Sequence, residues 1–543
     1  MKKLIALTIG LLLLLSLFAG CDNPVKPAEP ETGLPGEKAV PVPAGVKPTE
    51  DNARVFYEIF VGSFSDSDGD GIGDLRGIIN RMDYLNDGSD SSGKSLGVEG
   101  IWLTPIFPSD SYHKYDVDDY CAVDKRFGTT DDLKELAELC HSRNVELILD
   151  LPINHTSRNH SWFKSFTEAR KNGDTNSPYY DFYSCYTEGE TAPAGRAFSK
   201  LYGTDVYFEC NFWDGMPELN FDNDAVRQAV LDAAKFWLDL GVDGFRFDAA
   251  KYVYYGDNAA SMEFWNWYMG QLRAHKPDLY AVAEVWDADA VTQLYYPAMN
   301  CFNFTVSQAE GFLAKGAAGN IGRYISYVDQ YTDSITGTNP NAMYVPFIAN
   351  HDTDRCAGYL PTRNGRAQMA ANLLLLGPGS PFIYYGEEIA MRGSRGSANT
   401  DSNRRLAMVW GDEDSIRDPE GSSYDADNRA DAPVMEQIAN ESSLYTHYKK
   451  VILLRKANPE IAHGDFTPVS LSNSKLGGFI SAWKGSRVLV IHNPTEDPVT
   501  LDLGDLNLGD FNTLSGWVGL GECALEGSSL TVGGQSSVVL REG

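Results

Sequence analysis

Side chains able to carry acid, base or nucleophilic chemistry follow a series of short apolar runs in the sequence. They are Asp150, Asn154 and His155 after one run, Arg246 and Asp248 at the end of a second, Glu284 at the end of a third, and His351 and Asp352 after a fourth. Paired carboxylates can act as nucleophile and as general acid and base. Any one of these residues alone could be a helix cap or an ion-pair partner. Their joint placement at strand ends favours a catalytic site.

A second acidic group lies in a glycine-rich loop near the start of the chain. Residues 66–74 read Asp-Ser-Asp-Gly-Asp-Gly-Ile-Gly-Asp, with carboxylates at alternate positions and glycines that permit a sharp turn. This is the layout by which a loop wraps an oxygen-preferring cation. Gly77 stands where a helix-loop-helix calcium site would supply a bidentate glutamate, so that motif is incomplete. The alternative is a solvated acidic turn.

Eight candidate strands must position these residues. Residues 54–389 alternate short β-branched or aromatic runs with amphipathic helices, which is the pattern of successive βα units. Eight such units predict an α/β fold, a (β/α)₈ barrel, with functional residues at the C-terminal ends of its strands. The candidate strands are 55–60, 100–104, 145–151, 244–248, 280–284, 301–304, 345–350 and 382–385.

Two further domains interrupt and follow the predicted barrel. The gap between the third and fourth strands is too long for a simple crossover, so residues 155–219 are predicted to form an inserted domain. The barrel then covers 53–154 and 220–463. It includes a helix over 224–240 that Asn223 caps and that buries Val226, Val230, Trp237 and Leu240. Alternating segments broken by Asn, Gly and Pro over 464–543 predict a C-terminal antiparallel β-sandwich.

The first residues have the parts of a bacterial export signal. A basic start precedes an apolar run over 4–18, which is too short for a comfortable membrane span, and small residues follow at 19–20. Residues 17–21, Leu-Phe-Ala-Gly-Cys, resemble a lipobox. This predicts a lipoprotein signal peptide over 1–20, lipidation of Cys21, and an extracytoplasmic protein held at a membrane through that lipid alone. Ordinary signal cleavage is the alternative. The proline-rich segment 21–52 is predicted to be a disordered tether.

Charge and cysteine content limit the partners. The formal net charge of −30 would repel nucleic-acid phosphates and anionic lipid, so we expect a neutral substrate and no nucleic-acid partner. No organic cofactor is expected. The cysteines form no CxxC or Cys/His cluster that would indicate zinc. Cys185 and Cys210 of the inserted domain could form a disulfide or remain two buried thiols.

Four of the polar segments resemble the signature regions of the α-amylase superfamily of glycoside hydrolases. They are Asp-Leu-Pro-Ile-Asn-His at 150–155, Gly-Phe-Arg-Phe-Asp-Ala-Ala-Lys at 244–251, Ala-Glu-Val-Trp at 283–286, and Phe-Ile-Ala-Asn-His-Asp at 347–352. They occur in the order of the family and at a spacing that suits a barrel. Met-Pro-Glu-Leu-Asn at 216–220 resembles the fifth region in a form near the neopullulanase and oligo-1,6-glucosidase branches. Tyr-His-Lys-Tyr-Asp at 112–116 resembles the loop after the second strand.

The resemblance implies a role for each residue that matches a family motif. Asp248 is implied as the nucleophile and Glu284 as the acid/base of a retaining hydrolysis, in which the two carboxylates lie about 5–5.5 Å apart. Asp352 is implied as a third carboxylate that binds ring hydroxyls. Substrate contacts are implied for Tyr115, Asp116, His155, Arg246, Lys251 and His351. Arg246, two residues before Asp248 on one strand, should lie on the same face and keep Asp248 ionised.

The resemblance also implies a structural Ca²⁺ or Mg²⁺ in the acidic loop. Its ligands would be Asp66, Asp68, Asp70, the Ile72 carbonyl and Asp74. A second ion could bind at Asn154. That second ion is less well supported, because Tyr252 stands after Lys251 where the family usually has histidine.

The expected reaction is endo-type hydrolysis of α-1,4-glucosidic bonds in starch, glycogen and maltodextrins. Ala249-Ala250-Lys251 after the nucleophile resembles α-amylases, whereas strict α-1,6 enzymes of the family carry valine directly after it. The alternatives are an α-glucosidase, a neopullulanase-like activity or a glucanotransferase acting on maltooligosaccharides. A non-catalytic glucan-binding lipoprotein is a further alternative, and the presence of all three carboxylates opposes it.

Overall fold

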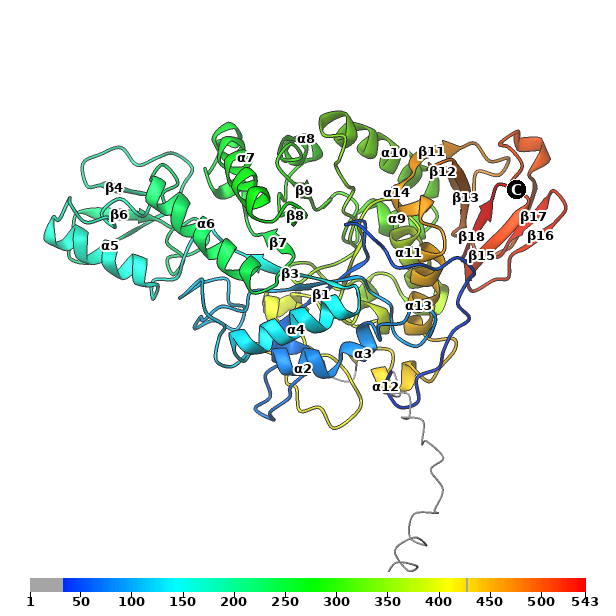
Figure 1. Ribbon diagram of the computed structural model, residues 1–543, viewed down its shortest axis with the longest axis horizontal. Coiled ribbons are helices and arrows are strands. Elements are labelled where there is room, and N and C mark those ends of the chain that lie inside the picture. Colours follow the sequence, from blue (N-terminus) through cyan, green and yellow to red (C-terminus); the bar gives the residue numbers. More distant parts are fainter. Residues whose placement is uncertain (1–32, 426–427) are drawn as a thin grey trace, which may run out of the picture.

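The computed structural model describes residues 33–425 and 428–543. The inserted domain lies at one end of the molecule and the C-terminal domain at the other, with the barrel between them (Figure 1). The predicted signal peptide and Cys21 fall outside the described residues. Within those residues, no helix has the length and hydropathy needed to span a bilayer.

Parallel strands form the wall of the barrel. Those described are β1 (Phe56–Ile59), β2 (Gly100–Leu103), β3 (Glu146–Leu151), β7 (Gly244–Phe247), β8 (Tyr280–Ala283), β9 (Asn300–Cys301) and β10 (Phe382–Tyr384). They pair in the order β10-β1-β2-β3-β7-β8-β9. From β1 to β9, each barrel strand is therefore hydrogen-bonded to the next barrel strand in the chain, as the βα pattern predicts.

The seventh predicted strand is the exception. Residues 345–350 form no regular strand, and that prediction is wrong. Val345 forms one parallel bridge to Phe302, and Phe347 forms one to Phe382. Pro346, between them, has no N–H to donate to a ladder, so regular pairing cannot continue through it. The two bridges nevertheless close the gap between β9 and β10, and the predicted (β/α)₈ barrel is confirmed.

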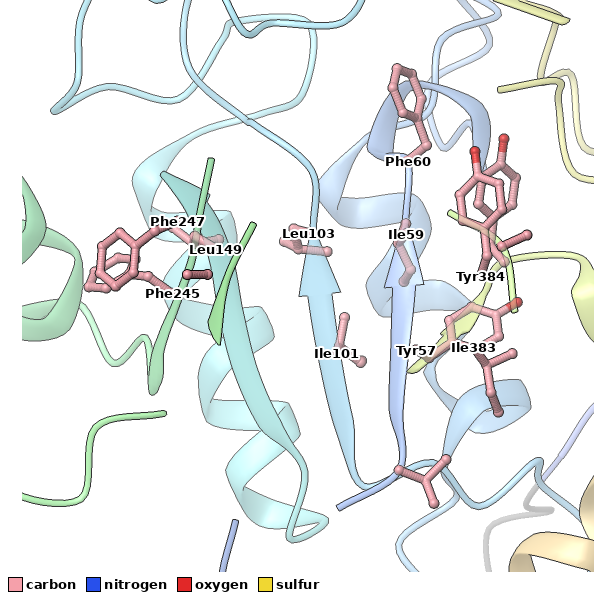
Figure 2. Packing of buried hydrophobic residues seen from close by; sticks show 14 of the residues in the cluster. Tyr57, Ile59, Phe60, Ile101, Leu103, Leu149, Phe245, Phe247, Ile383 and Tyr384 are labelled. Carbon is pink, nitrogen blue, oxygen red and sulfur yellow. The ribbon is translucent and has the colours of Figure 1, made fainter. Parts of the chain in front are cut away.

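Alternation along the strands separates two apolar layers. Figure 2 shows Tyr57 and Ile59 of β1 with Ile101 and Leu103 of β2 in the layer packed beneath the helices. The residues between them point into the barrel. The interior cluster contains Phe56, Trp102, Ile148, Tyr280, Val282, Phe302, Phe304, Val345, Phe347 and Phe382. By the same alternation Glu58 of β1 and Arg246 of β7 face the interior.

Helices surround this wall. They are α2 (Leu75–Asn80), α3 (Met82–Leu85), α4 (Thr130–Ser142), α6 (Asp224–Asp239), α7 (Asn258–His275), α8 (Asp289–Thr292), α9 (Phe312–Ala317), α10 (Ile321–Thr338), α11 (Arg366–Leu375), α12 (Val434–Gln437), α13 (Leu444–Lys456) and α14 (Glu460–His463). The predicted cap of α6 is present, since the Asn223 side chain accepts from the Ala225 N–H. Val226, Val230 and Trp237 are buried on this helix, whereas Leu240 is only half-buried.

The inserted domain is a small antiparallel sheet with one covering helix. Strands β4 (Cys185–Thr187), β6 (Val206–Glu209) and β5 (Phe198–Lys200) pair in that order, and α5 (Ser161–Asn172) packs on one face. Phe163 of α5 meets Phe208 of β6 with ring centroids 5.1 Å apart. Every cysteine among the described residues is a free thiol. Of the two alternatives for Cys185 and Cys210, the structure has the free thiols.

The C-terminal domain consists of two antiparallel sheets. One contains β11 (Asp465–Val469), β12 (Gly477–Trp483), β13 (Ser486–Asn493), β18 (Ser536–Arg541) and β15 (Thr513–Gly519). The other contains β14 (Val499–Asp502), β17 (Ser529–Val532) and β16 (Ala524–Glu526). Leu489 and Leu540 of the first sheet share an apolar cluster with Leu501 and Leu530 of the second. The predicted C-terminal antiparallel β-domain is confirmed.

Residues 33–52 are bound to the barrel, so the prediction of a disordered tether is wrong for this part of segment 21–52. Val40 is buried, and its N–H donates to the Gly93 carbonyl at 2.9 Å. The Glu37 carboxylate accepts from Tyr445 at 2.6 Å and lies 3.5 Å from the Lys449 ammonium, both partners being on α13. A few backbone hydrogen bonds and one buried ion pair hold the segment, and neither produces a hydrophobic period in the sequence. We call residues 33–52 the N-terminal clasp.

Candidate active site

A cleft of about 830 Å³ lies at the C-terminal ends of the barrel strands. Six of the predicted site residues line it: Tyr115, His155, Asp248, Lys251, Glu284 and Asp352. Asp248 directly follows β7, and Glu284 directly follows β8. Phe247 and Ala283, the residues before them, are paired across the two strands. Neighbouring parallel strands are about 4.8 Å apart, so the two carboxyl groups start from adjacent positions.

The guanidinium of Arg246 connects three carboxylates beneath the cleft. Nη1 lies 2.8 Å from Asp150 Oδ1 and 2.6 Å from Asp248 Oδ1, and Nη2 lies 2.9 Å from Glu284 Oε2. The Arg246 side chain is only 1% exposed. Burial raises the pKa of Asp248, and the charge of Arg246 opposes that increase. The predicted ion pair between Arg246 and Asp248 is therefore present, and the same arginine also orients Glu284.

Glu284 is held in a state suited to donating a proton. Burial raises its pKa to about 7, against the opposing charge of Arg246. The Ala249 N–H donates to Glu284 Oε2 at 2.9 Å. Ala249 reaches this position with φ of +49°, a left-handed conformation that costs energy for a residue with a Cβ. The turn after Asp248 thus fixes the orientation of the second carboxyl group.

Asp352 belongs to a chain of alternating charges. Arg405 Nη2 lies 2.7 Å from Asp352 Oδ1, and His351 Nε2 lies 3.0 Å from Asp352 Oδ2. His351 Nδ1 in turn lies 2.5 Å from Glu58 Oε1. Burial alone would lower the pKa of His351, but Asp352 and Glu58 raise it to about 10, so the imidazole is protonated at neutral pH. Burial alone would raise the pKa of Asp352, but His351 and Arg405 hold it below its usual range.

Tyr115 and His155 form part of the wall above these carboxylates. The Tyr115 hydroxyl donates to Asp150 Oδ2 at 2.8 Å, and the Tyr115 ring stacks on His351 with centroids 5.5 Å apart. His155 Nε2 lies 3.1 Å from the Tyr115 carbonyl. Burial lowers the pKa of His155 to about 4, so its ring is neutral and can donate one hydrogen bond. Lys251 lines the cleft, and its ammonium donates hydrogen bonds to the Trp286 carbonyl and the Asp287 carboxylate.

Three of the predicted substrate-binding residues do not line the cleft. Arg246 and His351 lie behind the carboxylates that they contact. Asp116 is buried and accepts hydrogen bonds from Ser109, at 2.7 Å, and from Ser111. This placement does not support the prediction that Asp116 contacts substrate. Its role in the structure is to fix the loop that carries Tyr115.

The structure adds cleft residues that strand-end reasoning missed. They are Tyr112, His113, Phe212, Trp213, Met216, Ala249, Tyr252, Trp286, Asn399, Thr400, Asp401 and Arg405. Arg405 follows a short 3₁₀ turn rather than a strand, so no strand pattern in the sequence indicated that it belongs to the site. Glu58 could have been predicted as a site residue from the sequence, because it is a lone acid inside the apolar run Phe56–Ile59. A carboxylate in a buried strand needs a partner, and His351 supplies it.

The acidic loop brings together part of its predicted ligand set. Ligand oxygens of Asp66, Asp68 and Asp74 lie within 4.8 Å of one another, and Asp70 is not part of this group. Gly69 and Gly71 have φ of +87° and +93°, which the turn of the loop requires. All three donors are carboxylate oxygens, the type that Ca²⁺ and Mg²⁺ prefer. The group therefore fits a hard divalent cation.

Asn154 is buried beside the inserted domain. Its side-chain nitrogen lies 3.4 Å from His155 Nδ1. In the part of the chain that the structure describes, the residues around Asn154 form no group of three or more acidic, histidine or cysteine ligands. A second metal ion at this position stays a prediction.

Comparisons with known proteins agree with this geometry. The family model for the alpha-amylase catalytic domain matches residues 58–464. Alpha-amylase 3 of Dictyoglomus thermophilum is 34% identical over 81% of this chain and 84% of its own. An oligo-1,6-glucosidase of Bacillus cereus is 29% identical over 83% of this chain and 91% of its own.

Solved structures extend the similarity to nearly the whole chain. Amy13B of Eubacterium rectale superimposes with a TM-score of 0.84 at 33% identity, over 93% of this chain and all of that one. The alpha-amylase from H. orenii gives a TM-score of 0.79 at 33% identity, over 91% of this chain and all of that one. The similarity therefore includes the inserted and C-terminal domains as well as the barrel.

Proposed function

The chain belongs to the α-amylase family of glycoside hydrolases, and on that premise we propose that it is a retaining, endo-acting α-amylase. Its substrates would be the α-1,4-linked glucans of starch, glycogen and maltodextrins. The observation that carries the proposal is the Arg246 guanidinium, which bridges Asp248 and Glu284 directly beneath an open cleft. The names of two similar proteins, from Dictyoglomus thermophilum and H. orenii, support an α-amylase over the other activities of the family.

In the first step Asp248 attacks the anomeric carbon while Glu284 protonates the departing glycosidic oxygen. With its pKa raised to about 7, Glu284 still carries the proton in about half of the molecules at pH 7. Asp248, paired with Arg246, supplies the electron pair and forms the glycosyl-enzyme bond. The leaving sugar departs with the proton.

In the second step Glu284, now ionised, takes a proton from water, and the resulting hydroxide displaces Asp248 from the sugar. Asp352 is fixed by Arg405 and His351 on the cleft wall and stays ionised, so it can accept hydrogen bonds from ring hydroxyls. Those bonds favour the distorted sugar of the transition state. Tyr115, which stacks on His351, offers a ring face to the same sugar.

We further propose that Asp66, Asp68 and Asp74 bind a structural Ca²⁺, with Asp70 and the Ile72 carbonyl completing the set. When bound, the ion would neutralise the carboxylates and hold the loop after β1. It takes no part in bond cleavage.

Localisation at a bacterial membrane is also a proposal, and it rests on the lipobox-like residues before Cys21. Metabolic labelling with a fatty-acid analogue tests it. Label on the wild-type protein and none on a Cys21→Ser variant is the expected result.

Product analysis tests the proposed function most directly. Amylose should yield a range of maltooligosaccharides early in the reaction, and proton NMR of fresh products should show the α-anomer first. Release of glucose alone would indicate an α-glucosidase, and products longer than a maltotriose substrate would indicate a glucanotransferase. Rapid cleavage of pullulan would favour the neopullulanase-like alternative. A β-anomer appearing first would overturn the roles of Asp248 and Glu284.

A further inference from the structure

The outer face of the inserted sheet carries three aromatic side chains. Tyr186 of β4 is paired directly with Tyr207 of β6, and Lys200 of β5 is paired with Tyr207 on the other side. Residues directly opposite in a sheet share a face, and so do residues two apart on one strand. Phe198, two residues before Lys200, therefore belongs to the same face. We call Tyr186, Phe198 and Tyr207 the aromatic platform.

The platform is on the side of the sheet away from α5. Val206 and Phe208, the neighbours of Tyr207 on β6, point the other way and are buried, and α5 covers that side through Phe163. The three platform rings stay partly exposed, and Lys200 beside them is exposed. In Figure 1 helix α5 likewise lies along one side of β4 and β6.

The platform rings are ordered against one another. Tyr186 and Tyr207 stack with centroids 5.0 Å apart and an interplanar angle of 10°. Phe198 meets Tyr186 edge-on at 4.9 Å. The Lys200 ammonium lies 5.2 Å from the Tyr207 ring centre and 2.9 Å from the Glu188 carboxylate. The partly exposed aromatic rings are thus bordered by charged groups able to make hydrogen bonds.

Further contacts connect the platform to the catalytic cleft. Phe212 and Tyr252, which both line the cleft, have ring centroids 5.3 Å apart, and Tyr255 follows 5.4 Å from Tyr252. Arg196 donates to the Tyr255 carbonyl at 3.2 Å, and its other terminal nitrogen lies 3.1 Å from the Glu209 carboxylate.

Glu209 is in turn paired with Phe198 of the platform. The chain of contacts that begins in the cleft therefore reaches the inserted sheet through Arg196 and Glu209.

We propose that the aromatic platform binds a stretch of α-glucan chain beyond the catalytic cleft and so holds polymeric substrate on the enzyme. The proposal rests on the proposed function, since it assigns the polymer as substrate. A glucose ring has apolar C–H faces that pack on aromatic rings, and hydroxyls around its edge that pair with polar groups. The platform supplies the rings, and Lys200 and Glu188 supply the polar border. The net charge of −30 disfavours an acidic polymer there.

The test compares two double variants with wild type and a control. Tyr186→Ala/Tyr207→Ala removes the stacked pair. Tyr186→Leu/Tyr207→Leu keeps apolar bulk without a flat face and covers the case in which the alanine variant fails to fold. Tyr180→Ala is the matched control, because Tyr180 is a half-exposed tyrosine of the same domain that stacks on Arg170 of α5.

Two measurements are made on each protein: adsorption to insoluble starch with the cleft saturated by a short non-hydrolysable maltooligosaccharide, and kcat/KM on amylopectin and on maltotriose. We expect both double variants to adsorb at least about fivefold more weakly and to lose a similar factor in kcat/KM on amylopectin, as for loss of an aromatic anchor. Activity on maltotriose should not change, and Tyr180→Ala should match wild type in all assays.

Adsorption of the double variants equal to wild type would overturn the proposal. An equal loss on maltotriose and amylopectin would overturn it as well, because the substitutions would then be acting on the catalytic cleft. Failure of wild type to hydrolyse either substrate would refute the proposed function. Adsorption would still report separately on the platform.

Discussion

Replacement of Glu284 by glutamine should change how the stability of the enzyme depends on pH. Burial raises the pKa of Glu284 from its ordinary value of 4.5 to about 7, and its side chain is only 16% exposed. Between these two pH values the unfolded chain has released the proton and the folded chain still holds it. Unfolding therefore releases a proton, and the free energy of unfolding falls as pH rises through this window.

The size of the effect follows from the pKa shift. At about 1.4 kcal/mol per unit, the carboxyl group costs the folded state about 3 kcal/mol once the pH exceeds 7. A glutamine at this position has no such cost. The free energy of unfolding of Glu284→Gln minus that of wild type should therefore rise by about 3 kcal/mol between pH 4.5 and 7, and then stay level. Other buried acids, such as Glu146, with its pKa raised to about 7 by burial, are present in both proteins and cancel.

Urea unfolding followed by tryptophan fluorescence at pH 5, 6, 7 and 8 measures this difference. Glu310→Gln is the control, because the Glu310 side chain is 91% exposed and its replacement should give a difference that hardly varies with pH. In the wild type, kcat/KM should fall above about pH 7 as Glu284 loses its proton. A stability difference for Glu284→Gln that is flat across this pH range would refute the assignment of Glu284 as the protonated acid.

Four further results are expected. Asp248→Asn should keep the circular dichroism spectrum and lower kcat/KM by at least about 10³-fold, and a loss below about tenfold would contradict its role as nucleophile. Chelation should lower the melting temperature of wild type, because an ion that binds only the folded state stabilises that state. Asp68→Asn should remove this response to chelator. A wild-type melting temperature that does not change in chelator would exclude the metal. Arg405→Ala should lower kcat by about 10- to 100-fold, because Asp352 loses a charged hydrogen bond. Arg405→Lys should recover part of this loss, and a wild-type kcat in the alanine variant would contradict the role of Arg405. Lys449→Met should lower the free energy of unfolding by about 3–5 kcal/mol, because it leaves Glu37 buried without its cation. The double variant Lys449→Met/Glu37→Gln should lose less unfolding free energy, and equal losses would show that the ion pair is not the cause.

The sequence predicted the parts of the molecule that repeat a simple rule. Strands with apolar runs end in polar residues at one rim of a barrel, so Asp248, Glu284 and Asp352 were all placed in one cleft. The ion pair of Arg246 with Asp248 followed from their spacing of two on one strand. These features depend on strand periodicity, which is visible in the order of residues alone.

The features that were missed depend on contacts that follow no strand or helix period. Arg405 reaches Asp352 from a loop with no period, and Pro346 interrupts a strand whose apolar pattern is otherwise continuous. Asp116 matched a family motif, yet local hydrogen bonds to Ser109 and Ser111 turn it away from the cleft. The partner of Arg405 is remote in the sequence, the missing N–H of Pro346 is a backbone group, and the serine partners of Asp116 are nearby but follow no strand or helix period.

The N-terminal clasp also limits how far the barrel can lie from Cys21. A free chain from Cys21 to residue 52 could extend about 110 Å, at about 3.6 Å per residue. Because residues 33–52 are held on the barrel by Glu37, Val40 and their partners, the chain that remains before residue 33 can span at most about 40 Å. With a lipid at Cys21, the start of the N-terminal clasp would stay within about 40 Å of the membrane. Long glucan chains would then have to diffuse to an enzyme held at that surface, and their cleavage products would be released there.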